Sequence, residues 1–365
     1  MKHAILSAVL AAALLPTLAL ADITVTDAEG RKVSLPDLPE RIVLGFYFED
    51  YIAVGGAEAA DRLVGLSRFP WAGWRPAQFA AYEKVLPQIG TLPDVGYAEE
   101  GDFSAEKVIA LRPDLLLVAA GDFRAMPEAI AQIEGAGIPV VALDYNAQTV
   151  EKHVASTLAL GQLLGTEARA EELAQTYKAA MDDIHARIAA STEPKGRKVY
   201  VELAKAGPAE IGNSYSNAMW GALVSGLGGQ NIADGQIGNY GPLSPEYVLA
   251  QQPELIFLAG SDWQNAPQAV TLGLGADPQT ARARMAAYEQ RPGWSELPAV
   301  KQGHVYAINH GGARTLSDYT YAQFIAKQLY PKAFADVDPD ANRRAFYAKW
   351  LPIDASGTFM LGLSE

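Results

Sequence analysis

The stretch FSAEKVIALRPDLLLVA, residues 103–119, is nearly repeated 140 positions later as LSPEYVLAQQPELIFLA, residues 243–259. The two copies share seven identical residues, and Asp114 of the first corresponds to Glu254 of the second. Each copy predicts a short helix that begins after a serine cap, ends before a proline and leads into a buried strand. The repeat favours two related α/β units in one chain, with chance similarity between two such units as the alternative.

The rest of the chain alternates short apolar strands with helical patterns, which is typical of parallel α/β layers. Continuous apolar runs that contain β-branched residues indicate strands buried on both faces. Strands are predicted at 41–45, 61–67, 114–120 and 138–144, and again at 198–203, 254–260 and 303–309. Helices are predicted at 104–111, 126–136, 216–229, 317–331 and 338–352.

A long helical stretch at 149–190 separates the two sets of strands; it lacks proline and is rich in Ala, Leu and Glu. Gly161 and Gly165 either kink this stretch or divide it into two helices. The predicted fold class is α/β, with two Rossmann-like lobes of parallel sheet joined by a long rigid linker helix. The N-terminal lobe is predicted at 22–146, the linking helix at 147–192 and the C-terminal lobe at 193–365.

Residues 1–21 have the pattern of a secretory signal peptide. Lys2 precedes an almost wholly apolar run, and the small residues of ALA at 19–21 suit cleavage before Asp22. A membrane anchor is the alternative, but a run of about 17 apolar residues is near the lower limit for crossing a bilayer. The chain has no cysteine, which excludes disulfides and a lipid-bearing cysteine. We therefore expect a soluble protein exported to the periplasm.

Charge and motifs make several functional classes less favourable. The formal net charge is −13 and there is no run of Lys or Arg, which disfavours binding to nucleic acid or to anionic membranes. An exported α/β enzyme is a weaker alternative, because the chain has no Gly-x-Ser-x-Gly elbow and no Gly-rich phosphate loop. We expect no catalytic residues.

These features together resemble the class III periplasmic binding proteins, which deliver ferric siderophores, haem or cobalamin to ABC importers. The resemblance covers about residues 22–352. It rests on the repeat, on an export signal, on two α/β lobes around a helical linker, and on two further segments, LPERIVLGFYFEDYIAVGGAEAADRLVGLS at 38–67 and RPGWSELPAVKQGHVYAI at 291–308.

The resemblance also implies a partner. In the family, a glutamate at the tip of each lobe docks into arginine pockets of a two-subunit permease, and Glu106 and Glu246 occupy those motif positions. A carboxylate in the first turn of a helix also suits the helix dipole, which is the purely structural alternative. We expect a monomer that meets the permease dimer through these two residues. A sensory module that signals to a receptor is a further alternative.

The ligand of such a fold is expected at the carboxyl ends of the strands, between the lobes. The segments that follow the predicted strands are aromatic, and Arg75, Arg124 and Arg314 add positive charge to them. Flat aromatic walls with guanidinium groups suit a large, oxygen-rich anionic chelate. Each aromatic residue taken singly fits core packing equally well. Trp74, Tyr215 and Tyr240 belong to these segments, and the residues predicted to bind ligand are Tyr47, Trp71, Arg75, Trp220 and Trp263.

The predicted function is capture of an iron complex, a ferric siderophore foremost, for delivery to an ABC permease. A prepacked chelate brings its own iron ligands, so no resident cofactor is expected. Haem held by Tyr47 or Tyr51, cobalamin, and iron bound directly by Tyr47, Glu49 and His310 are alternatives. The histidines share no short ligand spacing, which disfavours a closed zinc site.

Overall fold

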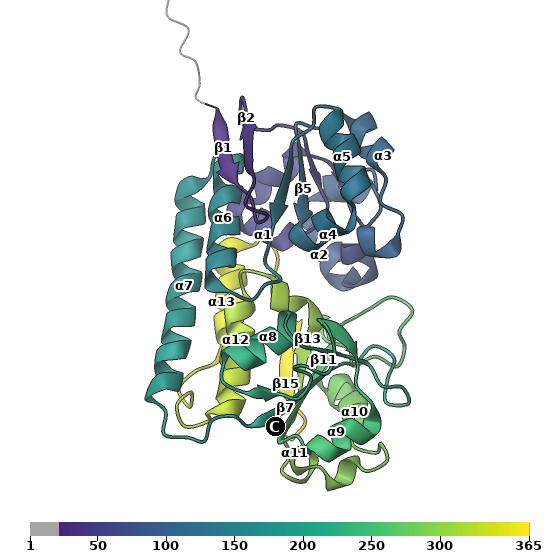
Figure 1. The fold of residues 1–365 in the computed structure, drawn as a ribbon, viewed down its shortest axis with the longest axis vertical. Coiled ribbons are helices and arrows are strands. Elements are labelled where there is room, and N and C mark those ends of the chain that lie inside the picture. The colour runs from purple at the N-terminus through teal and green to yellow at the C-terminus, as the bar shows by residue number, and fades with distance from the viewer. Residues whose placement is uncertain (1–21, 365) are drawn as a thin grey trace, which may run out of the picture.

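The computed structural model describes residues 22–364, so the predicted signal peptide lies outside the described residues. Two α/β lobes follow one another along the long axis of the molecule (Figure 1). Helix α7 (Glu167–Ala190) runs beside both of them. Within the described part, no helix combines the length and apolar character needed to cross a membrane. The predicted fold class is confirmed.

The N-terminal lobe is built on a four-stranded parallel sheet. Its order is β4 (Leu63–Leu66), β3 (Ile42–Leu44), β5 (Leu115–Ala119) and β6 (Val140–Leu143). All side chains of β3, β5 and β6 are buried, as expected for strands covered on both faces. The helices of this lobe are α1 (Phe48–Gly55), α2 (Pro76–Val85), α3 (Ala105–Leu111), α4 (Ala120–Ala125) and α5 (Pro127–Gly135), and α6 (Val150–Leu164) follows in the linking region.

The C-terminal lobe repeats this order and adds an edge strand. Its sheet runs β9 (Gln230–Asn231), β7 (Lys198–Leu203), β11 (Leu255–Gly260), β13 (Val305–Asn309) and an antiparallel β15 (Met360–Gly362). Its helices are α8 (Met219–Gly226), α9 (Pro245–Gln251), α10 (Pro278–Tyr288), α11 (Pro298–Lys301), α12 (Asp318–Leu329) and α13 (Pro339–Trp350). The remaining strands form two-stranded pairs: β1 (Ile23–Thr26) with β2 (Lys32–Leu35), β8 (Asn213–Tyr215) with β10 (Tyr240–Pro242), and β12 (Gly273–Leu274) with β14 (Gly357–Thr358).

The sequence repeat is also a structural repeat. The Ser104 hydroxyl accepts a hydrogen bond from the backbone N–H of Lys107 at the start of α3, and Ser244 caps α9 through Tyr247 in the same way. Each helix has seven residues and ends at a left-handed residue before its proline. The repeat therefore fixes one helix–strand unit in each lobe.

The linking region contains two helices rather than one. Gly165 ends α6 in a left-handed conformation (φ 67°), and α7 begins two residues later and packs back against α6. A Cβ atom at Gly161 would lie only 2.3 Å from the Cβ of Ala170, so glycine permits this close packing. At about 1.5 Å per residue, the 24 residues of α7 extend about 36 Å. It contacts α1 of the first lobe and α12 of the second, so it braces the two lobes against each other.

Candidate functional site

A cleft of about 480 Å³ lies between the lobes. Its walls are formed by segments that follow the carboxyl ends of parallel strands, where ligands of open α/β sheets bind. From the N-terminal lobe it is lined mainly by Trp74, Tyr97, Glu99, Glu100, Asp122 and Asn146. From the C-terminal lobe it is lined mainly by Lys205, Tyr215, Met219, Tyr240, Trp263, His310 and Arg314.

Aromatic rings form much of this surface. Trp74 lies edge-on to Tyr97 with ring centroids 5.5 Å apart, and the ring of Phe46 packs against both. On the other side Tyr215 lies 5.3 Å from Tyr240, whose side chain is 47% exposed. Large rings held by one another cost little conformational entropy when they meet a ligand.

Arg314 is a buried cation at this cleft. It is only 7% exposed, and its guanidinium lies 5.4 Å from the Phe46 ring centroid and 5.0 Å from that of Trp74. Its Nε atom has no hydrogen-bond partner, and no carboxylate among the described residues forms an ion pair with it. Burial, and then the nearby charge of Arg75, lower the pKa of Arg314 from its ordinary value.

His310 links Arg314 to a tyrosine. The Arg314 guanidinium is 3.3 Å from His310 Nε2, and His310 Nδ1 is 2.9 Å from the Tyr215 hydroxyl. Burial, and then the charge of Arg314, hold the pKa of His310 well below its usual value, so the ring is neutral. Since a guanidinium can only donate, Nε2 accepts and Nδ1 carries the proton that is donated to Tyr215. The hydroxyl proton of Tyr215 is then free to be donated elsewhere.

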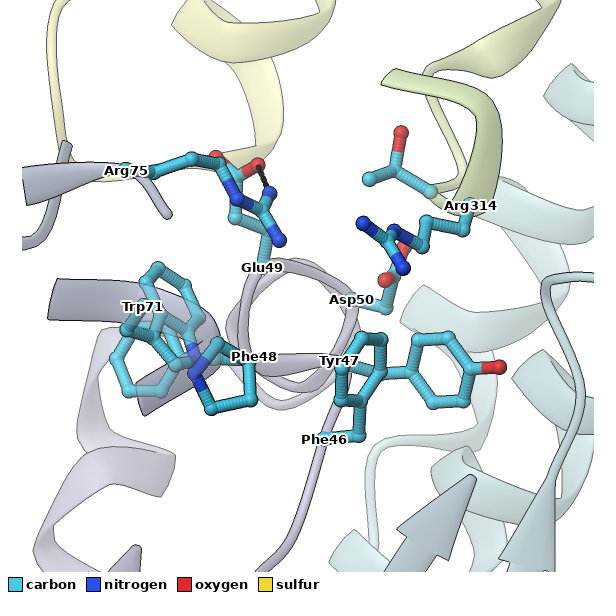
Figure 2. A pocket seen from close by; sticks show the side chains of 10 residues that line it. Phe46, Tyr47, Phe48, Glu49, Asp50, Trp71, Arg75 and Arg314 are labelled. Atoms are coloured by element: carbon cyan, nitrogen blue, oxygen red, sulfur yellow. Dashed lines mark ion pairs between the residues drawn. The ribbon is translucent and has the colours of Figure 1, made fainter. Parts of the chain in front are cut away.

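A small hollow adjoins the cleft, and Figure 2 shows its lining. Its volume of about 10 Å³ holds no more than about one water molecule. Arg75 and Arg314 reach into this region from the two lobes (Figure 2), and Arg75 lies 3.9 Å from a carboxylate oxygen of Glu49. Tyr82 donates a hydrogen bond to the same carboxylate at 3.0 Å. Glu49 therefore compensates the charge of Arg75, while Arg314 has no such partner.

Asp50 joins the lobes beneath this hollow. Its carboxylate accepts a hydrogen bond of 2.7 Å from the backbone N–H of Leu316 in the C-terminal lobe. Burial raises the pKa of Asp50 to about 8, and the negative charge of Glu49 acts in the same direction. The carboxyl group is therefore largely protonated at neutral pH.

Three further hydrogen bonds join the lobes directly. The Ser261 hydroxyl donates to the carbonyl oxygen of Trp74 at 2.8 Å, and the backbone N–H of Gln264 donates to the carbonyl oxygen of Gly73 at 3.1 Å. Asp262 accepts from the backbone N–H of Ala77 at 2.9 Å, so a residue of one lobe caps helix α2 of the other. This contact, called the lobe latch below (residues 73–77 with 261–264), holds Trp74 and Trp263 in place at the cleft.

The residues predicted to bind ligand occupy three different places. Trp263 lines the cleft. Tyr47, Trp71 and Arg75 line the small hollow beside it. Trp220 has no exposed surface and packs in the core with its ring centroid 5.5 Å from that of Tyr321, so in this structure it does not face the cleft.

The start of helix α1 explains why Tyr47 does not line the cleft. The aromatic segment that follows the first predicted strand is not a loop throughout, because helix α1 already begins at Phe48. Tyr47 adopts a left-handed conformation (φ 57°) at the start of this helix, and its ring is buried. By contrast, sequence reasoning did not single out Tyr97, Glu99, Asp122 or Lys205, which do line the cleft.

The proposed direct iron ligands are not brought together. Tyr47 accepts a hydrogen bond from the backbone of Tyr145, Glu49 is held by Tyr82 and Arg75, and His310 is held by Tyr215 and Arg314. Tyr51 is buried and donates to the carbonyl oxygen of Ala59. Among residues 22–364, no group of three or more His, Asp or Glu side chains is placed to hold a metal ion.

The two repeated glutamates are at the surface and do not line the cleft. Glu106 is the second residue of α3 and Glu246 the second of α9, and both side chains are exposed. In Figure 1 the two helices lie towards opposite ends of the long axis, both on the side remote from α7. This geometry leaves both carboxylates free to meet one extended partner.

Comparison with known proteins agrees with this architecture. A family model described as periplasmic binding protein matches residues 45–310. The TroA-like periplasmic binding protein FepB from Veillonella parvula superposes with a TM-score of 0.86 at 33% identity, covering 93% of this chain and 99% of that one. The molybdate-binding protein MolA of Haemophilus influenzae is 25% identical over 94% of this chain and 96% of its own length. The substrate-binding lipoprotein YvrC of Bacillus subtilis, named for an ABC transporter, is 23% identical over 86% of this chain and 87% of its own length. The chain therefore belongs to the periplasmic binding proteins of ABC importers, in the class III group that its repeated motif predicts.

Proposed function

We propose that this binding protein captures an oxygen-rich, negatively charged metal chelate, a ferric siderophore foremost, in the cleft between its lobes. The observation that carries the proposal is the buried, unpaired guanidinium of Arg314. Withdrawing a charge from water costs several kcal/mol unless an opposite charge compensates it. A ligand anion compensates it here, and guanidinium geometry suits the oxygens of a carboxylate, hydroxamate or catecholate.

The size and walls of the cleft support the same class of ligand. Its volume of about 480 Å³ lies within the usual range of roughly 300–1,000 Å³ for small-molecule sites. Rings of Trp74, Tyr97 and Trp263 offer apolar faces to the organic part of a chelate. The metal travels as cargo with its own ligands, and no resident cofactor is proposed. A molybdate-binding relative makes a metal-containing anion reasonable as cargo.

Haem in the same cleft is the second candidate. The exposed ring of Tyr240 favours it, because a phenol oxygen at the rim of an aromatic cleft can ligate haem iron. Cobalamin is a related candidate ligand, because a corrinoid also offers a broad face to aromatic rings.

We propose further that Glu106 and Glu246 dock the loaded protein onto an ABC permease. Both carboxylates are exposed, lie at the same place in two copies of one motif, and form no ion pair within the described chain. Two like sites on two lobes suit a partner with two similar subunits. The protein acts in this proposal as an exported monomer in the periplasm.

The test begins with protein purified from iron-limited cells. A visible charge-transfer band together with the mass of a bound ferric chelate is the expected result, whereas a Soret band would favour haem. Ligand-free protein is then titrated with ferric chelates, haem and cyanocobalamin. Quenching of tryptophan fluorescence is expected because Trp74 and Trp263 line the cleft. Flat titrations with all of these compounds would refute the proposal.

A further inference from the structure

The N-terminal wall of the cleft is acidic. Glu99 and Glu100 in the short turn Ala98–Glu100 and Asp122 in α4 all line it. None of the three forms an ion pair with a Lys, Arg or His within residues 22–364, although carboxylates elsewhere, such as Asp27 and Asp340, do. Burial, and then the charge of Glu99, raise the pKa of Asp122 to about 7. The wall therefore carries carboxylates that no ion pair within residues 22–364 neutralises.

The same wall offers hydrogen-bond acceptors and aromatic faces. The side-chain oxygen of Asn146 is buried at the cleft and has no partner. Tyr97 and Trp74 lie between this wall and Arg314 and present their rings to the cleft. Carboxylates combined with aromatic faces are the chemistry by which proteins recognise a substituted ammonium group.

The opposite wall has the opposite charge. Lys205 and the nine-tenths-buried Arg314 line it from the C-terminal lobe. Arg314 is near enough to Asp122 to lower the pKa of that carboxyl, yet the two groups form no ion pair. Positive and negative groups therefore face the same space without meeting, and a ligand that lies between them satisfies both.

We propose that the cleft selects a bipolar chelate: metal-bound oxygens face Arg314, and a protonated amine on the far side of the ligand lies against Glu99 and Asp122. This inference rests on the proposed function, because it assumes that the cleft holds a chelate. It adds a selectivity that the buried arginine alone does not imply, because the three carboxylates favour a chelate that turns a cationic group, rather than further negative charge, towards their wall.

Two probes that differ in a single charge test the inference. Ferrioxamine B and its N-acetyl derivative share one ferric trihydroxamate core, and only the first has a terminal ammonium. Their affinities are measured by tryptophan quenching at pH 8, where Asp122 is mostly ionised. The proteins compared are the wild type, the cleft variant Glu99→Gln/Asp122→Asn, and a control variant Glu83→Gln/Glu128→Gln that removes two exposed acids of the same lobe.

The wild type and the control are expected to bind the ammonium form at least about tenfold more tightly, which corresponds to about 1.4 kcal/mol. The cleft variant is expected to bind both forms equally. Equal affinities in the wild type, or a preference that survives in the cleft variant, would overturn the inference. Binding of ferric citrate without binding of either ferrioxamine would overturn it too, while leaving the proposed function standing. No binding of the ferrioxamines, ferric citrate, haem or cyanocobalamin would remove both.

Discussion

Replacing Arg314 by methionine should weaken chelate binding strongly while leaving the protein about as stable as before. Arg314 is 7% exposed and has no carboxylate partner in the described structure, so its charge is withdrawn from water without compensation. Methionine has a similar length, needs no hydrogen bonds, and adapts well to an aromatic environment. Ligand affinity is thus expected to fall without a matching loss of stability.

The magnitudes follow from the contacts of the guanidinium. Its desolvation penalty is several kcal/mol. Against this stand two cation–π contacts, with Phe46 and Trp74, worth about 0.5–2 kcal/mol each, and one hydrogen bond to His310 worth about 1 kcal/mol. These contacts sum to about 2–5 kcal/mol and nearly offset the penalty, so the free energy of unfolding should change by no more than about 2 kcal/mol. A ligand anion that loses its charged partner should lose about 3–4 kcal/mol of binding, or a factor of about 100–1,000 in Kd.

The assay is urea unfolding of ligand-free protein at pH 7, followed by a fluorescence titration with the chelate found in purified material. Arg124→Met is the matched control, because Arg124 is an exposed arginine that undergoes the same chemical change outside the cleft lining. It should bind ligand normally. Loss of more than about 2 kcal/mol of stability in Arg314→Met, together with unchanged affinity, would refute the reasoning, because it would mean that Arg314 is a structural cation already satisfied by the protein.

Three further predictions concern the lobe junction and the outer surface. Asp50 has a folded-state pKa of about 8. Burial and the charges of Glu49 and Asp318 raise this pKa, whereas the Leu316 N–H and His153 lower it. The folded protein therefore binds a proton that the unfolded chain releases above about pH 4. The free energy of unfolding should fall as pH rises from about 5 to 8, by up to about 1.4 kcal/mol per pH unit. In urea unfolding measured at both pH values, Asp50→Asn should show a smaller dependence on pH. If the variant keeps the wild-type dependence, groups other than Asp50 cause it. Asp262→Ala removes the cap that the lobe latch supplies to α2, so the free energy of unfolding should fall by about 0.5–2 kcal/mol. The radius of gyration measured by X-ray scattering should increase. An unchanged radius would show that α7 alone sets the spacing of the lobes. Glu106→Lys/Glu246→Lys should keep ligand affinity but lose stimulation of the permease ATPase, whereas Glu83→Lys/Glu128→Lys should keep both; full stimulation by the first variant would remove the docking proposal.

The sheets were predictable because their strands are buried on both faces. A strand such as Leu115–Ala119 must be apolar along its whole length, and this requirement is visible in any sequence. The start of α1 was not predictable in the same way. Its first residues are aromatic and acidic, and Tyr47 precedes them without a side-chain cap, so neither helix propensity nor a capping motif indicates the boundary.

The cleft was predictable in position but only partly in composition. Strand order places the segments after β4, β5, β7, β11 and β13 at one site, and their aromatic content indicated a binding surface. Which ring faces the cleft depends on packing at each segment: Trp263 does, whereas Trp220, in the first turn of α8, packs into the core. The acidic wall combines Glu99 and Asp122 from separate segments, and no local pattern reports that they become neighbours.

The repeat also explains how one protein can present like surfaces to its partner and unlike surfaces to its ligand. The 140-residue offset that pairs Glu106 with Glu246 also pairs Asp122 with Asp262. The glutamates retain the same exposed place on both lobes, as the proposed docking to a partner with two similar subunits requires. The aspartates have diverged: Asp262 is occupied in capping α2 across the lobe latch, whereas Asp122 faces the cleft without a partner. Since one aspartate closes the lobes and the other remains free, the cleft has a charge difference between its two walls, and a ligand with two unlike ends is the one that fits it.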